Sequence, residues 1–247
     1  LDAEFLYVEN ADEVLLEQAK GKIVLVNGYL NRATYEKLRK AEAAAILTFT
    51  GRTIDRGNES DLNRCQLCET LTEPFGASPV LNMRTASAAE IVRRGAKTVH
   101  IELTGECYDG TSQNVCATIP GTDKPSEVIT LGGHYDSVYF SSGVHDNLSG
   151  SVIVLELLRY FAAHPPRRTL RFCWFGSEEQ GLLGSKAYVK AHADELKDCV
   201  AMLNFDVAAP TLGSNHLVTL ATDDARHYVA GVLREAGYGV RAKQDTY

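Results

Sequence analysis

Short apolar runs alternate with helical segments through the second part of the chain, and this alternation constrains the fold more than any other feature. The apolar runs stop at glycine, proline or acidic residues, as expected for buried strands that end in loops. The expected strands cover 114–119, 127–133, 168–175, 199–206 and 216–222, and the expected helices cover 149–163, part of 176–192, and 224–236. This order predicts an α/β fold with a mixed, largely parallel sheet and helices on both faces.

The first part of the chain has a smaller pattern of the same kind. The β-branched run at 21–28 and the run at 44–49 predict strands, and the composition of 34–45 predicts a helix between them. Residues 51–73 are polar and irregular, which indicates a long surface loop. A turn-rich joint at 105–114 then separates two expected domains, 1–105 and 106–247.

Two helical segments carry expectations about burial. In the amphipathic segment 12–19, we expect Val14, Leu15 and Leu16 to point inward. The segment 149–163 is apolar almost all round, which predicts a helix buried on every side.

Composition limits the function classes. The 247 residues are 45% hydrophobic and 23% charged, which is typical of a globular domain, and the net charge of -7 argues against a nucleic-acid surface. The longest apolar run, SVIVLELL, is too short to span a membrane and contains Glu156. The sequence begins at Leu1 without a Met, and no signal peptide is visible at its start. The cellular location therefore stays open between secreted and cytoplasmic. The oligomeric state also stays open.

The six cysteines do not form a complete zinc motif. Cys65 and Cys68 make a CxxC without a second ligand pair nearby, so free thiols or a local disulfide are favoured over a zinc knuckle. Cys107 and Cys116 flank a turn and can pair if the compartment is oxidising. Cys173 lies within an apolar strand and is expected to be a small core residue.

Polar side chains gather where three of the predicted strands end. Because ligands bind beyond the carboxyl ends of parallel strands, these groups are expected to meet at one rim of the sheet. The group consists of one imidazole and five carboxylates: His134, Asp136, Asp146, Glu178, Glu179 and Asp206. A solvated acidic rim is the alternative interpretation, but so much negative charge at one place favours bound cations.

The spacing of these residues suggests separate roles. His134 and Asp136 are two apart, so Asp136 either shares a metal with the imidazole or holds the ring from behind. Asp146 is the candidate for a carboxylate that bridges two ions, and zinc, manganese or cobalt suits such a ligand set. Glu178 and Glu179 are adjacent, so one can bind metal while the other accepts a proton from water. His145 is expected to be an exposed or supporting loop residue.

Four motifs in this order carry a family resemblance: GGHYDSV, GVHDNLSG, FGSEEQGLLGS and LNFD. They resemble the cocatalytic two-zinc exopeptidases, which include bacterial secreted aminopeptidases and glutamate carboxypeptidase-type enzymes. The first 100 residues, with GKIVLVNG and AEAAAILTF, are similar to the protease-associated domain that many members carry. The resemblance covers most of the chain and implies a zinc-peptidase-like fold for the second domain.

The resemblance also implies a role for each site residue. His134 and Asp206 would hold one zinc, Glu179 the other, and Asp146 both. Asp136 would orient His134. Glu178 would be the general base that accepts a proton from the metal-bridging water and passes it to the leaving amine.

One expected ligand is missing. The family's last zinc ligand is a histidine near the C-terminal end of the domain, whereas this sequence stops at QDTY, 244–247. We therefore expect a chain that is truncated before this ligand, with an incomplete second zinc site and reduced or no activity of its own.

The resemblance predicts a zinc-dependent exopeptidase with a peptide substrate, and an aminopeptidase first of all. Three alternatives remain: a carboxypeptidase, a glutaminyl cyclase on the same scaffold, and a non-catalytic receptor-like homologue. Intact motifs argue against the last of these, because a decayed site would be expected to lose ligands.

Overall fold

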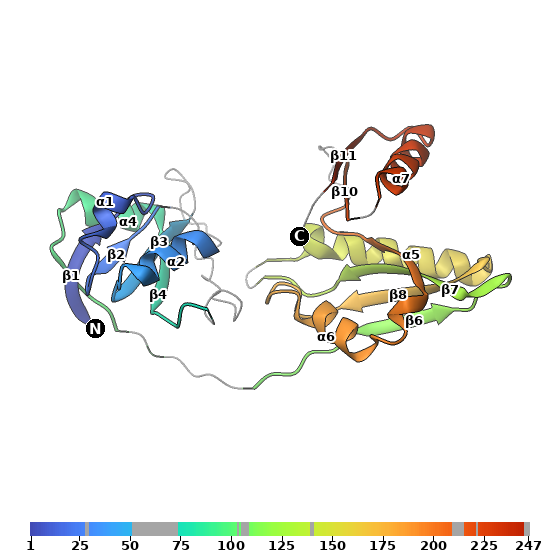
Figure 1. Ribbon diagram of the computed structural model, residues 1–247, viewed down its shortest axis with the longest axis horizontal. Helices are drawn as coiled ribbons and strands as arrows, with labels where there is room; N and C mark the ends of the chain where they lie inside the picture. Colours follow the sequence, from blue (N-terminus) through green and yellow to red (C-terminus); the bar gives the residue numbers. More distant parts are fainter. Residues whose placement is uncertain are drawn as a thin grey trace. The chain divides into compact units, whose positions relative to one another are not determined.

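The computed structural model describes residues 1–27, 30–50, 74–102, 104, 109–138, 141–208, 215–220 and 222–244. The chain divides into two compact units, Leu1–Gly110 and Thr111–Tyr247 (Figure 1). The expected loop at 51–73, with Cys65 and Cys68, lies outside the described residues, as does Cys107.

The first unit is built on a five-stranded sheet in the order β4-β3-β2-β1-β5. The strands are parallel except β5, which runs antiparallel to β1. Their bounds are β1 Asp2–Tyr7, β2 Ile23–Leu25, β3 Ala45–Thr50, β4 Val80–Arg84 and β5 Thr98–His100. The helices are α1 Glu13–Leu16, α2 Arg32–Lys40 and α4 Thr85–Arg93.

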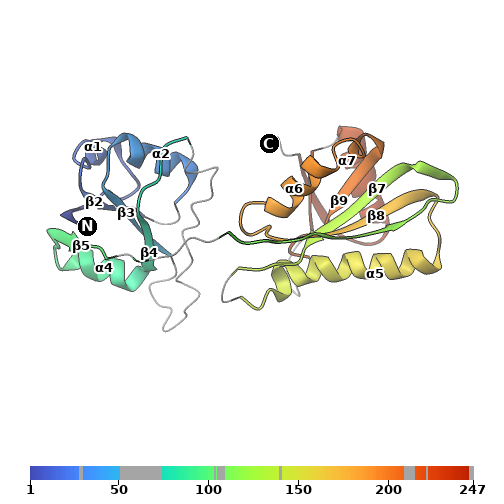
Figure 2. The ribbon, with the colours of Figure 1, turned by 90° about the horizontal axis from the view of Figure 1, so that it is seen from below.

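Strand β2 shows why both faces of this sheet are covered. Alternate residues of a strand point to opposite faces. Val24 packs in the cluster that contains Tyr35 of α2, whereas Ile23 packs in the cluster that contains Ala88 of α4. Figure 2 shows α2 and α4 on opposite sides of the sheet.

One burial prediction in this unit is wrong. Val14 is 67% exposed, because α1 is a single short turn whose inner side is already occupied by Leu15 and Leu16. The assignment of 1–105 to a protease-associated domain stays a prediction.

The second unit contains a four-stranded sheet in the order β6-β8-β7-β9. Strand β6 is antiparallel to β8, and the other neighbours are parallel, so the predicted mixed, largely parallel sheet is confirmed. The bounds are β6 Val115–Ile119, β7 Lys124–His134, β8 Arg168–Phe175 and β9 Cys199–Asn204. Around them lie η2 Val144–Leu148, α5 Ser149–Ala163, α6 Leu183–Ala191 and η3 Leu196–Asp198.

Helices cover both faces of this sheet, as Figure 2 shows for α5 and α6. Strand β8 contacts both of them: Phe172 packs with Val154 of α5, and Phe175 on the opposite face packs with Tyr188 of α6. The prediction that α5 is buried on every side is wrong. Val152, Leu155 and Tyr160 are exposed, because the helix lies on one face of the sheet and contacts it along one side only.

A smaller element follows β9. Strands β10 Asn215–Thr219 and β11 Val240–Gln244 pair in parallel, and α7 Asp223–Glu235 connects them. The β11 strand was not predicted, since its sequence, VRAKQ, is mostly polar. Among the residues that the structure describes, no helix has both the length and the apolar character needed to cross a membrane.

Candidate metal centre

The carboxyl ends of three parallel strands meet at one place in the second unit. His134, the last residue of β7, is in register with Phe175 at the end of β8, and Gly132 is in register with Asn204 at the end of β9. Glu178 and Glu179 therefore follow β8, and Asp206 follows β9, beside the end of β7. Asp146 comes from η2, just before α5. The structure thus brings the predicted rim residues together.

His134 is the most buried member of the group, with 3% of the residue exposed. Its Nδ1–H donates a hydrogen bond of 3.1 Å to the backbone carbonyl of Asp136. Because the proton of the neutral ring is then on Nδ1, Nε2 carries the free lone pair. That atom is buried and has no hydrogen-bond partner among the residues that the structure describes.

Carboxylates nevertheless surround this nitrogen. The distances from Nε2 are 3.0 Å to Asp146 Oδ1, 3.4 Å to Asp206 Oδ1 and 3.8 Å to Glu178 Oε2. Asp146 is near enough for a hydrogen bond but is not aligned for one, since Nε2 has no such partner. An imidazole nitrogen and several carboxylate oxygens that converge on one point form the donor set of a transition-metal or zinc site.

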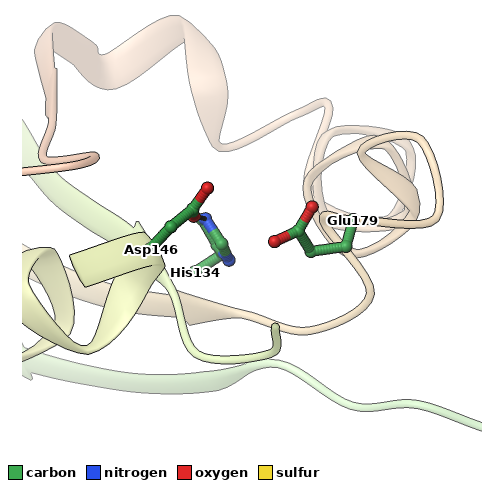
Figure 3. Close-up of side chains that lie close together, drawn as sticks. All are labelled: His134, Asp146 and Glu179. Carbon is green, nitrogen blue, oxygen red and sulfur yellow. Dashed lines mark ion pairs between the residues drawn. The ribbon is translucent and has the colours of Figure 1, made fainter. Parts of the chain in front are cut away.

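Glu179 completes the candidate ligand cluster. One ligand atom from each of His134, Asp146 and Glu179 lies within 4.8 Å of the other two. Figure 3 shows the Glu179 carboxylate facing His134 and Asp146 from the opposite side.

The Asp136 carboxylate also has a role that the sequence did not suggest, because it binds the backbone of the two glutamates. Oδ1 accepts a hydrogen bond of 3.0 Å from the backbone N–H of Glu178, and Oδ2 accepts one of 3.2 Å from that of Glu179. Oδ1 also lies 3.5 Å from His134 Nδ1, but the backbone carbonyl is the nearer partner. Asp136 therefore fixes the turn that carries both glutamates and stands close behind the imidazole.

Asn147 is a site residue that sequence reasoning missed. Its side chain is 1% exposed, and Nδ2 donates to the Phe205 carbonyl at 2.9 Å. Oδ1 accepts from the N–H of Val207 at 3.3 Å and from that of Gly150 at 3.0 Å. The Asn147 amide thus holds the backbone on both sides of Asp206. The peptide bond between Asp146 and Asn147 is cis. The adjacency of Asn147 to Asp146 was the only available signal.

Two further side chains support the rim from behind. Ser151 Oγ donates to the backbone carbonyl of His134 at 2.7 Å, which ties α5 to the end of β7. Asn114 accepts from the Gly176 N–H at 3.1 Å and donates to the Gly184 carbonyl at 2.9 Å. It thereby closes the loop that contains Glu178 and Glu179. His145 is exposed, as expected, and lies in η2.

Close packing at this rim requires glycine at position 150. A Cβ at this position would come within 2.1 Å of the Phe205 carbonyl oxygen. Any side chain there would push the first turn of α5 away from the segment that carries Asp206.

The concentration of negative charge perturbs the ionisation of the site. Burial raises the pKa of Glu178 and of Glu179, and the neighbouring carboxylates raise both further. Burial alone would lower the pKa of His134, but the surrounding carboxylates outweigh it and raise this pKa. These carboxylates are Glu178, Asp206, Asp136 and Asp146. Without a cation the rim favours bound protons, and a metal ion would replace them.

Comparisons with known proteins agree with this geometry. The model of a family described as peptidase family M28 matches residues 114–246. Among curated proteins, the chain is 33% identical over 192 residues to Aminopeptidase YwaD of Bacillus subtilis and 42% identical over 197 residues to an aminopeptidase of Pseudomonas aeruginosa. These matches cover 76% and 78% of the chain.

The fold also matches solved structures. The crystal structure of BSAP, described as a zinc aminopeptidase from Bacillus subtilis, superposes with a TM-score of 0.77 at 23% identity. The match covers 99% of this chain and 60% of that one. The chain spans 40% of the length of the Bacillus relative and 36% of that of the Pseudomonas relative. The family model nevertheless covers more than half of the chain, which therefore belongs to peptidase family M28.

Proposed function

We propose that this chain carries the metal centre of a zinc-dependent exopeptidase that removes the amino-terminal residue from peptides. The observation that supports this most strongly is the buried Nε2 of His134, which lacks a hydrogen-bond partner among the described residues and faces three carboxylates. The two similar proteins from Bacillus subtilis and Pseudomonas aeruginosa are both named aminopeptidases, which supports the same reaction.

The residues present fit zinc. A buried imidazole nitrogen with its lone pair free, together with carboxylate oxygens, is a ligand set that zinc binds in catalytic sites. His134 and Asp206 would hold one ion, Glu179 the other, and Asp146 both. When bound, zinc would polarise the scissile carbonyl and acidify a water molecule.

Glu178 would act as the general base. Its Oε2 lies 3.8 Å from His134 Nε2, so the carboxylate reaches the position where the metal ligands converge. Its raised pKa makes it a stronger proton acceptor than an ordinary glutamate once it is ionised. It would take a proton from the attacking water and deliver it to the amine that leaves.

Asp136 and Asn147 would position these groups without touching the substrate. Asp136 holds the backbone N–H groups of Glu178 and Glu179, which fixes the turn from which their side chains extend. Asn147 holds the backbone on either side of Asp206. A shift of about 1 Å in such supports is enough to lower activity strongly.

The test follows the products of short peptides by mass spectrometry. The chain is incubated with a peptide that has a free amino terminus, with its acetylated form, and with one that begins with glutamine, each with zinc and with a chelator. Loss of the first residue from the free peptide only, abolished by the chelator, supports the proposal. Loss of the last residue would identify a carboxypeptidase, ammonia loss from the glutamine peptide a cyclase, and absence of both reaction and zinc binding a non-catalytic homologue.

A further inference from the structure

Two cysteines face each other across the pair of strands β6 and β8. Cys116 and Cys173 are direct partners in the antiparallel register, and their sulfur atoms lie 3.6 Å apart. Cys173 is 0% exposed and packs with Phe175 and Tyr188 beneath α6, whereas Cys116 is exposed. The candidate metal centre and the proposed peptidase function use neither thiol.

We propose that Cys116 and Cys173 form a reversible disulfide that joins the edge strand β6 to β8. Direct partners on antiparallel strands have Cα atoms about 4.5 to 5.5 Å apart, which is within the range that a disulfide bridges. Their side chains also point to the same face of the sheet. The sulfurs need only a small rotation to approach to bonding distance.

The oxidant is a low-molecular-weight disulfide such as oxidised glutathione. The thiolate of Cys116, the accessible partner, attacks one sulfur of this molecule and releases one glutathione thiolate. Cys173 then loses its proton and attacks the Cys116 sulfur, releasing the second glutathione. Two protein thiols and one oxidised glutathione thus become one protein disulfide and two reduced glutathiones.

The order of these steps follows from burial. Burial, together with the neighbouring Cys116 thiol, raises the pKa of Cys173 to about 12, so its thiolate is scarce near neutral pH. Cys173 therefore acts as the second, resolving thiol. It reacts quickly only after Cys116 has formed the mixed disulfide beside it.

The disulfide would stabilise β6 and the neighbouring Asn114, which holds the loop that carries Glu178. Strand β6 is an edge strand, paired with β8 alone in this sheet. Two residues before Cys116, Asn114 holds both Gly176 and Gly184 at the two ends of that loop. The cysteines are 57 positions apart, and the segment between them contains His134 and Asp146, so the crosslink would restrict a long segment of the unfolded chain.

Peptide mapping tests the pairing. The full chain is equilibrated with oxidised glutathione, free thiols are alkylated, and the digest is analysed without reduction. A peptide that joins Cys116 to Cys173 is expected. Alkylated Cys116, or Cys116 joined to Cys107 or to any other cysteine, would overturn the proposal.

Thermal unfolding in oxidised and reduced glutathione gives a second test. The oxidised wild type is expected to melt on the order of 10 °C above the reduced form. Cys116→Ser and Cys173→Ala should each reduce the difference in melting temperature between the oxidised and reduced protein, and by the same amount. Cys199→Ser, at a cysteine whose sulfur makes polar contacts with Thr130 and Ala201, should keep this difference. If Cys116→Ser and Cys173→Ala reduce the difference in melting temperature by different amounts, or not at all, the two cysteines are not partners.

Discussion

Asp136 accepts a hydrogen bond of 3.0 Å from the backbone N–H of Glu178 across 42 positions of sequence. The same carboxylate accepts the N–H of Glu179, so one side chain after β7 orients two glutamates after β8. Both strands end at this rim because they are parallel neighbours in register. The site therefore depends on a contact between loops as much as on its ligands.

Asp136→Asn tests this contact. Asparagine keeps one acceptor oxygen but presents an amide donor to one of the two N–H groups, so the glutamate turn shifts. We expect zinc affinity to fall by about 10- to 100-fold, as for other residues that support metal ligands. Competition with a chromogenic chelator measures this. Asp123→Asn, at an exposed pair with Arg167, is the matched control and should change little. Equal affinities in the two variants would contradict the role of Asp136.

Glu178→Gln separates proton transfer from metal binding. Glutamine has nearly the same shape but cannot accept the proton at neutral pH, so turnover should fall by about 10²- to 10⁴-fold. Zinc affinity should change by less than about threefold, because Glu178 is not a proposed ligand, whereas Glu179→Gln should weaken it by about tenfold or more. Steady-state kinetics and chelator competition on the same samples measure both. Retained turnover in Glu178→Gln would remove it as the base.

Asn147→Ala should destabilise the second unit. The substitution removes the partner of the Phe205 carbonyl and of the Val207 N–H, both in partly buried bonds, and of the Gly150 N–H, in a buried bond. We expect a loss of about 3 kcal/mol in the free energy of unfolding, measured with denaturant. Asn215→Ala, which removes an exposed bond to Gly239, should cost less than about 1 kcal/mol. Similar losses of unfolding free energy in the two variants would show that the Asn147 hydrogen bonds do not contribute this stability.

The metal-free protein should lose stability as the pH rises. Glu178 and Glu179 have pKa values raised above 4.5, and His134 has one raised above 6.5. A group with a higher pKa in the folded state binds its proton more tightly there. The stability that it contributes is therefore complete below the unfolded pKa and is lost as the pH rises through the folded pKa.

Thermal unfolding of chelator-treated protein from about pH 5 to about pH 8 measures this effect. The melting temperature should fall over the range, and saturating zinc should remove the fall because the cation replaces the protons. Glu178→Gln should show a smaller fall than the wild type. A melting temperature that rises with pH in the metal-free wild type would contradict the charge distribution described here.

Several regular elements of the second unit could be predicted closely, whereas the mostly polar strand β11 could not. The bounds of β8 and α5 agree with the expected ranges because each has a clear end: Gly176 follows β8, and two prolines follow α5. The convergence of His134 with the acidic residues also followed from the rule that parallel strands end at one rim. These features depend on local sequence and on one general property of parallel sheets.

Contacts between distant loops could not be predicted. The Asn147 amide bonds to residues near position 206, and the Asp136 carboxylate bonds to residues near 178, and no local pattern specifies either pair. Burial was mispredicted at Val14, and for the outer side of α5, because hydrophobicity alone does not say how many neighbours surround a helix. The partnership of Cys116 with Cys173 likewise depends on strand register.

The most direct test of the central claim is a titration of the chelator-treated chain with Co²⁺, followed by its visible absorption spectrum. If His134, Asp146 and Glu179 form a metal site, the wild type should bind at least one Co²⁺ ion and develop d–d bands. Added zinc should displace the cobalt and abolish these bands. His134→Ala, shown by circular dichroism to remain folded, should lose these bands, while His145→Ala should keep them. A wild type without d–d bands, or a His134→Ala variant with an unchanged spectrum, would contradict the metal centre.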